Sequence, residues 1–441
     1  MKLKLTEVEN AKDIKAASVP SRFQLDNAAT IYPACRTRDW NNVYRFAIIF
    51  KEEINPVLLQ QAVDDFYNRL PTYFVRLRTG AFWYYFERIR SSRVVVQEDY
   101  YPCRAVNLFD SEKPCFRVMY YKRRLSLEAF HGVADGGASL IFIKSIAARY
   151  LQLLGYKIEI SGDLLNCEDS FKESEFEDSF KRHAVKVKGV KRSEVSSYQY
   201  EADPIPNYYK VIHGLIPVED LKALSKEYSI TITEYLSAVL LYAFYLDAPK
   251  PCKKPIKISI PISLRNSFES NSMRNFSLYT NIGFDATKKN NYTFEEVLEE
   301  IRGKLREGMD KEKLLKTFSK NVGDAGNPFV RFMPSGIKRQ VLNLGFKKVG
   351  QNQFIASMTN LGIAKMPDSA MEHIDRFEVL LGETPVKHIA IALISDGKNM
   401  NISFTSNAKR VDVQRFFFTF LSQKGARVRI ECNDKESWFK Q

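Results

Sequence analysis

Histidine and cysteine are both scarce in this chain. Its five histidines and six cysteines are scattered along 441 residues, without the paired spacing of a zinc site or a disulfide framework. The most apolar stretch, 235–246, is far too short to span a bilayer, and residues 1–15 are too charged for a secretory signal. We therefore expect a cytoplasmic protein with reduced thiols, no bound metal and no transmembrane segment.

The length of the chain predicts more than one hydrophobic core. A chain of 441 residues exceeds the usual limit of a single core, and its 45% hydrophobic content is ample for two. The segment 161–206 is charged and polar, which is typical of a linker or crossover. We expect an N-terminal half over 1–160, this linker, and a C-terminal half over 207–441.

The formal net charge of the chain is +14. Such a balance favours a polyanionic partner, which could be a nucleic acid, a membrane surface or a phosphate-bearing cosubstrate. The basic residues are spread along the chain, and no nucleic-acid-binding motif with interleaved aromatic residues is present. We therefore expect no nucleic-acid partner, and a solvated basic surface remains the simpler alternative.

His131 and Asp135 form the most informative motif. Apolar and polar residues alternate over 125–130, which predicts a strand, and 138–154 has apolar residues at helical spacing. An imidazole therefore emerges at the end of a strand, before a glycine-rich turn and a long helix. A histidine there can face a cavity, and Asp135 can turn back to fix the ring or the loop. This arrangement suits a general base acting on a hydroxyl or an amine.

The spacing of the two residues also permits a purely structural interpretation. His131 can be a buried histidine bonded to the backbone, and Asp135 can be a turn or helix-cap residue. The motif alone leaves this interpretation and the catalytic one open. A zinc site is a further alternative, but no third protein ligand is evident in the sequence.

The remaining pattern mixes strands with helices, which predicts an α/β fold with mixed sheets. Strands are predicted at 42–50, 73–78, 82–87, 116–122, 209–216 and 256–262, and around a turn at Asp396 and Gly397. Helices are predicted from Asn55 and Pro56, over 218–228, from the capping boxes of Thr231 with Glu234 and Thr293 with Glu296, and over 411–423.

Several segments resemble those of one enzyme family. The segments are 25–33 (LDNAATIYP), 261–265 (PISLR), 272–276 (SMRNF) and 357–362 (SMTNLG), together with His131, Asp135 and Gly136 in the pattern His-x-x-x-Asp-Gly. On these residues the chain resembles acyltransferases of the chloramphenicol-acetyltransferase-like fold. That group includes alcohol O-acetyltransferases, the plant BAHD enzymes and the condensation domains of nonribosomal peptide synthetases.

The resemblance implies two chloramphenicol-acetyltransferase-like halves flanking a tunnel, with the site between them. It also implies transfer of an acyl group, in the first instance acetyl, to an alcohol, with His131 as general base and no permanently bound cofactor. The chain departs in two places from the motifs of these enzymes, which argues against peptide-bond condensation and against close kinship with the plant enzymes. Condensation domains usually carry a second histidine where this chain has Phe130, and the Asp-Phe-Gly-Trp-Gly motif of the plant enzymes is absent. No carrier module is present, so we expect diffusible acyl-coenzyme A as donor and a small alcohol or amine as acceptor.

Other residues are candidates for supporting the site. The resemblance offers precedent for an arginine paired with Asp135, and Arg265, at the end of an apolar strand, is our choice, although a surface arginine is an equal alternative. Gly136 completes the signature and supports the loop. Four short polar residues are candidates to donate hydrogen bonds to an oxyanion or a substrate, although turn formation also explains each of them. They are Asn275, Ser357, Thr359 and Asn360.

Four lysines are candidates for binding the phosphates of coenzyme A. They are Lys253, Lys254, Lys347 and Lys348, which form two basic doublets in the second half. Two other functions stay open at this point. One is a catalytically silent binding or regulatory protein on the same fold, and the other is a condensation-type enzyme that forms amides.

Overall fold

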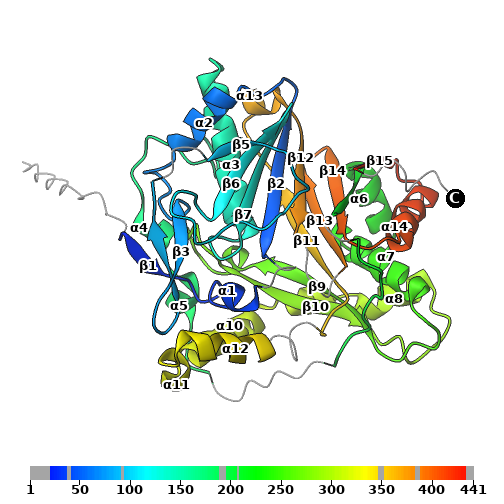
Figure 1. Cartoon of the computed structure of the whole chain (residues 1–441). Helices are drawn as coiled ribbons and strands as arrows, with labels where there is room; N and C mark the ends of the chain where they lie inside the picture. The colour runs from blue at the N-terminus through cyan, green and yellow to red at the C-terminus, as the bar shows by residue number, and fades with distance from the viewer. Residues whose placement is uncertain are drawn as a thin grey trace, which may run out of the picture.

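The computed structural model describes residues 20–36, 41–90, 94–187, 195–205, 208–345, 352–382 and 388–433. Within these ranges the strands form sheets of five, seven and three strands, and helices pack against them (Figure 1). The predicted α/β fold with mixed sheets is confirmed.

The five-stranded sheet carries His131 at the end of a central strand. Its order is β12-β2-β7-β6-β5. Its strands are β2 (Val43–Phe50), β5 (Val95–Gln97), β6 (Phe116–Tyr121), β7 (Arg124–Phe130) and β12 (Ile374–Leu381). Helices α2 (Pro56–Asp64) and α3 (Gly136–Leu153) pack on each other, and α3 lies against β2 and β7. The predicted strands β6 and β7 pair as a hairpin, and Asn55 caps α2 as predicted.

Strand β12 comes from the second half of the sequence but pairs with β2 of the first. The pairing is antiparallel and runs from Ile374 beside Phe50 to Leu381 beside Tyr44. Figure 1 shows β12 between β2 and the strands of the second half. The two expected halves therefore share a sheet, through a pairing of distant segments that no local pattern in the sequence predicts.

The seven-stranded sheet forms the core of the second half. Its order is β10-β9-β11-β13-β14-β8-β15. Its strands are β8 (Lys210–Pro217), β9 (Ile256–Ser263), β10 (Ser277–Phe284), β11 (Ala356–Ile363), β13 (Ile389–Ser395), β14 (Asn399–Ser406) and β15 (Arg429–Cys432). The predicted turn joins β13 to β14, with Gly397 at a φ of +96° that glycine adopts without strain.

Four helices share an apolar core with this sheet. They are α6 (Val218–Glu227), α7 (Ile232–Asp247), α8 (Phe294–Ile301) and α14 (Asp412–Gln423). Both predicted capping boxes are present at the starts of α7 and α8. Among the described residues, no single helix has the length and apolarity needed to cross a membrane, and α6 with α7 reaches that threshold only as a pair bent by 79°.

The segment expected to be a linker is packed against the rest of the chain. It contains α4 (Glu173–Phe176) and α5 (Ser179–His183). Glu175 accepts hydrogen bonds of 2.6 and 2.7 Å from the guanidinium of Arg69, and both side chains are buried. The remaining elements are β1 (Arg22–Gln24), β3 (Val75–Thr79), β4 (Tyr84–Arg88), α1 (Ile31–Cys35), η1 (Leu264–Asn266), α9 (Lys304–Gly308), α10 (Lys311–Gly326), α11 (Pro328–Arg331), α12 (Ser335–Gly345) and α13 (Asp368–Met371).

Gly283 allows β10 and β9 to approach closely. A β-carbon at this position would lie 2.1 Å from the carbonyl oxygen of Ile256, a backbone atom that cannot move aside. We expect Gly283→Ala to lower the free energy of unfolding by about 1–3 kcal/mol. Gly323→Ala, in the exposed part of α10 with open space around it, should instead raise it by about 0.5–1 kcal/mol. Urea unfolding of both variants checks this, and equal effects would contradict it.

Candidate active site

The loop after β7 holds His131 at the boundary between a strand and a helix. The backbone N–H of His131 donates to the carbonyl of Asn42 at 2.8 Å, and that of Val133 donates to Phe130 at 2.9 Å. A β-carbon at Gly132 would meet the Phe130 ring at 2.3 Å, so the turn requires glycine here. The local sequence therefore fixes where the imidazole leaves the sheet.

Two tyrosines surround the imidazole of His131. The ring of Tyr32 stacks on it with centroids 4.5 Å apart, and the ring of Tyr44 meets it edge-on at 5.1 Å. His131 is half-buried, so part of its surface stays accessible. Burial among these rings lowers the pKa of His131 below the usual histidine value, although Asp135 and Asn275 act in the opposite direction. The imidazole is therefore neutral at pH 7.

Asn275 connects His131 to a buried carboxylate. The Nδ1 atom of His131 lies 3.1 Å from Oδ1 of Asn275, and Nδ2 of Asn275 donates to Oδ2 of Asp26 at 3.1 Å. An ionised carboxylate accepts hydrogen bonds only, so the amide NH₂ must face Asp26 and the amide oxygen must face the imidazole. Nδ1 of His131 therefore carries the proton. Within the described residues no protein group is hydrogen-bonded to Nε2.

Asp26 is a fully buried carboxyl group. Burial raises its pKa to about 6, against the opposing charge of Arg274, whose Nε lies 3.8 Å away. Its two oxygens also accept backbone N–H groups, from Ala29 at 2.7 Å and from Asn275 at 3.3 Å. Asp26 is therefore mostly ionised at pH 7 and protonated in mild acid. The hydrogen bond that Asn275 donates to Asp26 thus depends on pH.

The carboxylate of Asp135 turns away from His131 and makes three bonds elsewhere. Oδ1 accepts the N–H of Ala138 at 3.1 Å, and Oδ2 accepts Arg265 Nη1 at 2.6 Å and the N–H of Phe276 at 2.7 Å. Burial raises the pKa of Asp135, but Arg265 and the two N–H groups outweigh it, so the net pKa is lowered. The predicted ion pair with Arg265 is present, and Asp135 also caps α3, as in the structural interpretation of the motif.

Arg265 also binds the loop that carries Asn275. Its guanidinium donates to the carbonyl of Ser272 at 2.8 Å and to that of Arg274 at 2.6 Å. One side chain thus joins the His131 loop of the first half to the 272–276 loop of the second. Gly136 begins α3 beside Leu361 of β11, whose Cδ1 would lie 3.3 Å from a β-carbon at residue 136.

The four short polar candidates have different surroundings. Asn275 faces His131 and Asp26, which gives it a positioning contact rather than the expected oxyanion contact. Asn360 donates to Thr233 Oγ1 and accepts the N–H of Gly362, both at 2.9 Å, so it supports the end of β11. Ser357 and Thr359 are half-buried on β11, on the same face of the strand as Leu361, and they stay candidates.

The two described lysine candidates, Lys253 and Lys254, lie far from His131. Lys253 and Lys254 are exposed before the first residue of β9, whereas Arg265 follows its last residue. Eight strand residues separate these ends by roughly 25 Å. Lys347 and Lys348 lie outside the described residues. Lys253 and Lys254 therefore do not lie beside the imidazole, and their contact with the phosphates of coenzyme A stays a prediction.

Sequence reasoning missed Asp26, Tyr32 and Tyr44 as site residues. Asp26 and Tyr32 lie in the segment 25–33, which carried part of the family resemblance, but nothing in its pattern indicates contact with residues 131 and 275. Tyr44 alternates with the residues of a buried strand and looks like core packing. Its hydroxyl bonds Ser139 Oγ at 2.7 Å and the Ala134 carbonyl at 2.8 Å, which fixes the ring against the loop.

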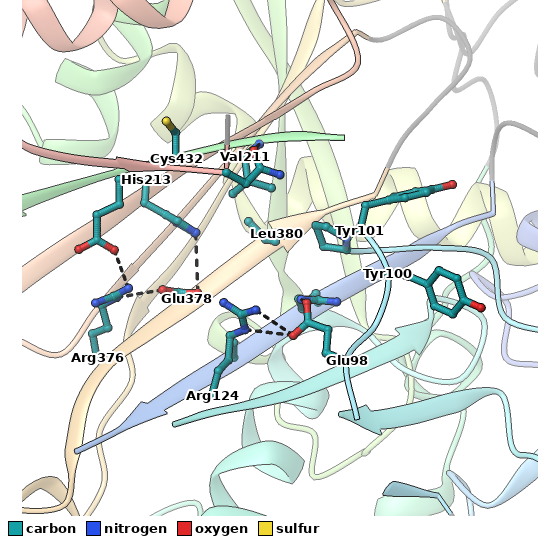
Figure 2. Close-up of a pocket in the computed structure, with 15 residues that line it drawn as sticks. Glu98, Tyr100, Tyr101, Arg124, Val211, His213, Arg376, Glu378, Leu380 and Cys432 are labelled. Carbon is teal, nitrogen blue, oxygen red and sulfur yellow. Dashed lines mark hydrogen bonds and ion pairs between the residues drawn. The ribbon is translucent and has the colours of Figure 1, made fainter. Parts of the chain in front are cut away.

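A cavity of about 320 Å³ lies on another part of the five-stranded sheet, and His131 does not line it. Figure 2 shows its paired charges, including Arg376 with Glu378, 2.9 Å apart. Arg376 also pairs with Glu431 at 2.7 Å. His213 Nε2 lies 3.7 Å from Glu378. These charges neutralise each other, so the cavity has no evident part in chemistry at His131. In the described ranges, no three His, Cys, Asp or Glu side chains gather closely enough to hold a metal ion.

Comparison with known proteins identifies the fold. No family model matches the sequence, and no curated relative matches it. The solved structure of polyketide synthase associated protein 5 from Mycobacterium tuberculosis matches with a TM-score of 0.56 and 13% identity, over 90% of this chain and 97% of that one. F. graminearum TRI101 complexed with coenzyme A and T-2 mycotoxin matches with a TM-score of 0.61 and 10% identity, over 92% and 99%.

The starter condensation domain of rhizomide synthetase RzmA also matches, with a TM-score of 0.53 and 11% identity, over 92% of this chain and 96% of that domain. At these identities the likeness concerns the fold alone. The chain has the mixed α/β fold that chloramphenicol-acetyltransferase-like acyltransferases share with condensation domains.

The ion pair of Asp135 with Arg265 should be the main charge-dependent support of the loop. Arg265→Met leaves a buried carboxylate without its cation, so we expect a loss of about 3–5 kcal/mol of unfolding free energy at pH 7. Because the pKa of Asp135 is lowered in the folded protein, the pair stabilises above the ordinary aspartate pKa of 3.8. The loss should therefore shrink as the pH falls through the lowered value.

Urea unfolding of Arg265→Met at neutral and acid pH measures this dependence. Arg410→Met is the matched control, because Arg410 pairs with Asp247 at 2.6 Å but is 54% exposed. It should cost less than about 1 kcal/mol. A similar loss for both variants, or a loss independent of pH, would refute the buried-pair argument.

Proposed function

We propose that this chain is an acyltransferase that moves an acyl group, in the first instance acetyl, from a coenzyme A thioester to an alcohol hydroxyl. The observation that carries the proposal is the protonation state of the His131 imidazole together with its contacts. Its imidazole is half-buried and neutral, Nδ1 is held by Asn275, and Nε2 has no protein partner in the described part of the chain. Such a ring is prepared to accept one proton at one defined atom.

The proposed reaction begins with the acceptor hydroxyl hydrogen-bonded to Nε2 of His131. As its oxygen attacks the thioester carbonyl, the proton passes to Nε2, and a tetrahedral oxyanion forms. Collapse of that intermediate breaks the carbon–sulfur bond, and the imidazolium returns the proton to the departing thiolate. The products are an ester and free coenzyme A thiol, so atoms and charge balance without an acyl-enzyme. No Gly-x-Ser-x-Gly nucleophile motif is present in the sequence.

The other residues have supporting roles in this proposal. Asp135 and Arg265 position the loop, since their charges are directed at each other and not at the substrate. Gly136 lets α3 begin close to β11. Ser357 and Thr359 stay the candidates to donate a hydrogen bond to the oxyanion.

Two observations support coenzyme A as the donor. A protein of the same fold binds it, and the net charge of this chain suits a donor that carries phosphates. F. graminearum TRI101, which shares the fold, is crystallised with coenzyme A and T-2 mycotoxin or deoxynivalenol. The net charge of +14 suits a donor that carries phosphates, so donor binding should weaken as salt rises. An amine acceptor would undergo the same proton transfer and yield an amide. A panel of alcohols and amines therefore separates ester formation from condensation-type chemistry.

Loss of the imidazole should abolish most turnover. We expect His131→Ala to reduce acceptor-dependent thiol release from acetyl-coenzyme A by about 10²–10⁴-fold while the protein stays folded. His388→Ala is the control, because that ring bonds Asn407 and belongs to another part of the fold. Near wild-type turnover of folded His131→Ala would exclude the base assignment. Donor binding by calorimetry with no thiol release for any acceptor would favour the silent binding protein.

Asn275 should act as a positioning residue through the tautomer of His131. In Asn275→Leu the imidazole loses its Nδ1 acceptor, so we expect kcat/KM for thiol release to fall by about 10–100-fold. The imidazole nitrogen shifts by NMR should report the Nδ1–H tautomer in the wild type and a mixture in the variant. Asn407→Leu removes an equivalent contact, at 2.9 Å, from His388 and should leave thiol release unchanged. A wild type with Nε2–H would contradict the assignment.

A further inference from the structure

Helix α12 exposes its apolar side and buries a lysine. Ile337, Val341 and Leu344 follow one another at the spacing of a single helical face, and they are 55%, 52% and 60% exposed. The buried residue of this helix is Lys338, whose ammonium lies 5.2 Å from the Trp83 ring and donates to the carbonyl of Arg331 at 3.1 Å. A core-facing helix has the reverse arrangement, so packing within the described chain does not explain this apolar face.

Two phenylalanines shortly before α12 in the sequence are also exposed. Phe329 of α11 is 87% exposed, and Phe332, one residue after α11, is 60% exposed. Phe332 meets the ring of Phe82 edge-on at 5.8 Å, which fixes its position. We call the set Phe329, Phe332, Ile337, Val341 and Leu344 the α11–α12 surface. Single exposed apolar residues are ordinary, but five exposed apolar residues within the one segment 329–344 are typical of an interaction site.

The same segment is strongly basic. Residues 311–345 contain seven lysines and arginines against two acidic residues. Arg331 lies between the two phenylalanines in sequence, and Arg339 follows Lys338. Both arginines are exposed, and neither forms an ion pair within the described residues. Cations beside exposed aromatic and aliphatic side chains are typical of elements that lie in the interface of an anionic bilayer.

The geometry points to the α11–α12 surface as a docking site for an anionic lipid bilayer. Figure 1 shows α10, α11 and α12 as an outer layer at the edge of the molecule, beyond α1. A protruding layer of this kind can insert its apolar side chains among acyl chains while Arg331 and Arg339 meet phosphate headgroups. No helix needs to cross the membrane for this mode of binding.

Docking at this surface would hold the membrane close to His131. Helix α12 packs on α1, and Tyr32 of α1 stacks on the imidazole. One short helix therefore separates the proposed lipid contact from the candidate site. Vesicle binding does not depend on the proposed chemistry, so the two proposals can fail separately.

Vesicle co-sedimentation of the full chain tests the docking site. The probes are vesicles of phosphatidylcholine alone and of phosphatidylcholine mixed with phosphatidylglycerol. We expect binding to the mixed vesicles, with affinity that falls as salt rises, and little binding to the neutral ones. The triple variant Phe329→Ser, Ile337→Ser, Val341→Ser should bind the mixed vesicles at least about tenfold more weakly.

The control is the triple variant Phe109→Ser, Val57→Ser, Val195→Ser, whose parent residues are 44%, 74% and 72% exposed elsewhere. It should bind like the wild type, and thermal unfolding verifies that both variants stay folded. Absence of wild-type binding, or equal losses in both variants, would overturn the proposal.

Sedimentation velocity tests whether the α11–α12 surface instead joins two copies of this chain. A wild-type dimer that becomes monomeric in the α11–α12 variant would identify the surface as a self-association interface and overturn the bilayer assignment.

Discussion

The carboxylate of Asp135 is the point on which the geometry of the site depends. It caps α3 through Ala138, pairs with Arg265, and accepts the N–H of Phe276, so three segments converge on one buried group. Arg265 in turn holds the carbonyl groups of the loop that presents Asn275. A buried carboxylate without these partners would be strongly destabilising, so the loops of the two halves are locked in one arrangement. These contacts of Asp135 and Arg265 therefore also fix the position of His131.

The charged groups near His131 hold the loop in place, and the group that contacts the imidazole ring is a neutral amide. Asp135 directs its charge away from the imidazole. The neutral amide of Asn275 contacts Nδ1 of His131 and donates a second hydrogen bond to the carboxylate of Asp26. A carboxylate in direct contact with the ring would raise the histidine pKa and favour the imidazolium. The amide of Asn275 also fixes the tautomer and raises the histidine pKa, but burial outweighs it and the net pKa stays below the ordinary histidine value. The arrangement therefore suits a base that must be neutral before each proton transfer.

Local sequence patterns predicted the elements that depend on neighbouring residues. The strand before His131, the helix after Asp135, the two capping boxes and the turn at Gly397 follow from alternation, helical spacing and turn chemistry. The Asp135–Arg265 contact was reached only with the family resemblance. The contact of Asp26 with Asn275, the stacking of Tyr32 and the crossing of β12 join segments distant in sequence, and no local periodicity encodes them. The lysine doublets stay predictions as phosphate ligands, because Lys347 and Lys348 lie outside the described residues and exposed lysines carry no positional signal.

The pH dependence of kcat/KM for acceptor-dependent thiol release tests the central claim most directly, because it reports the base in the free enzyme. If Nε2 of His131 accepts the proton, kcat/KM should rise with pH as the imidazolium loses its proton, with an apparent pKa below the ordinary histidine value of 6.5. Asp26, whose pKa is about 6, contributes to the same limb through Asn275. The same limb should be absent from the residual activity of His131→Ala. A limb well above 6.5, or an unchanged limb in the variant, would show that another group is the base.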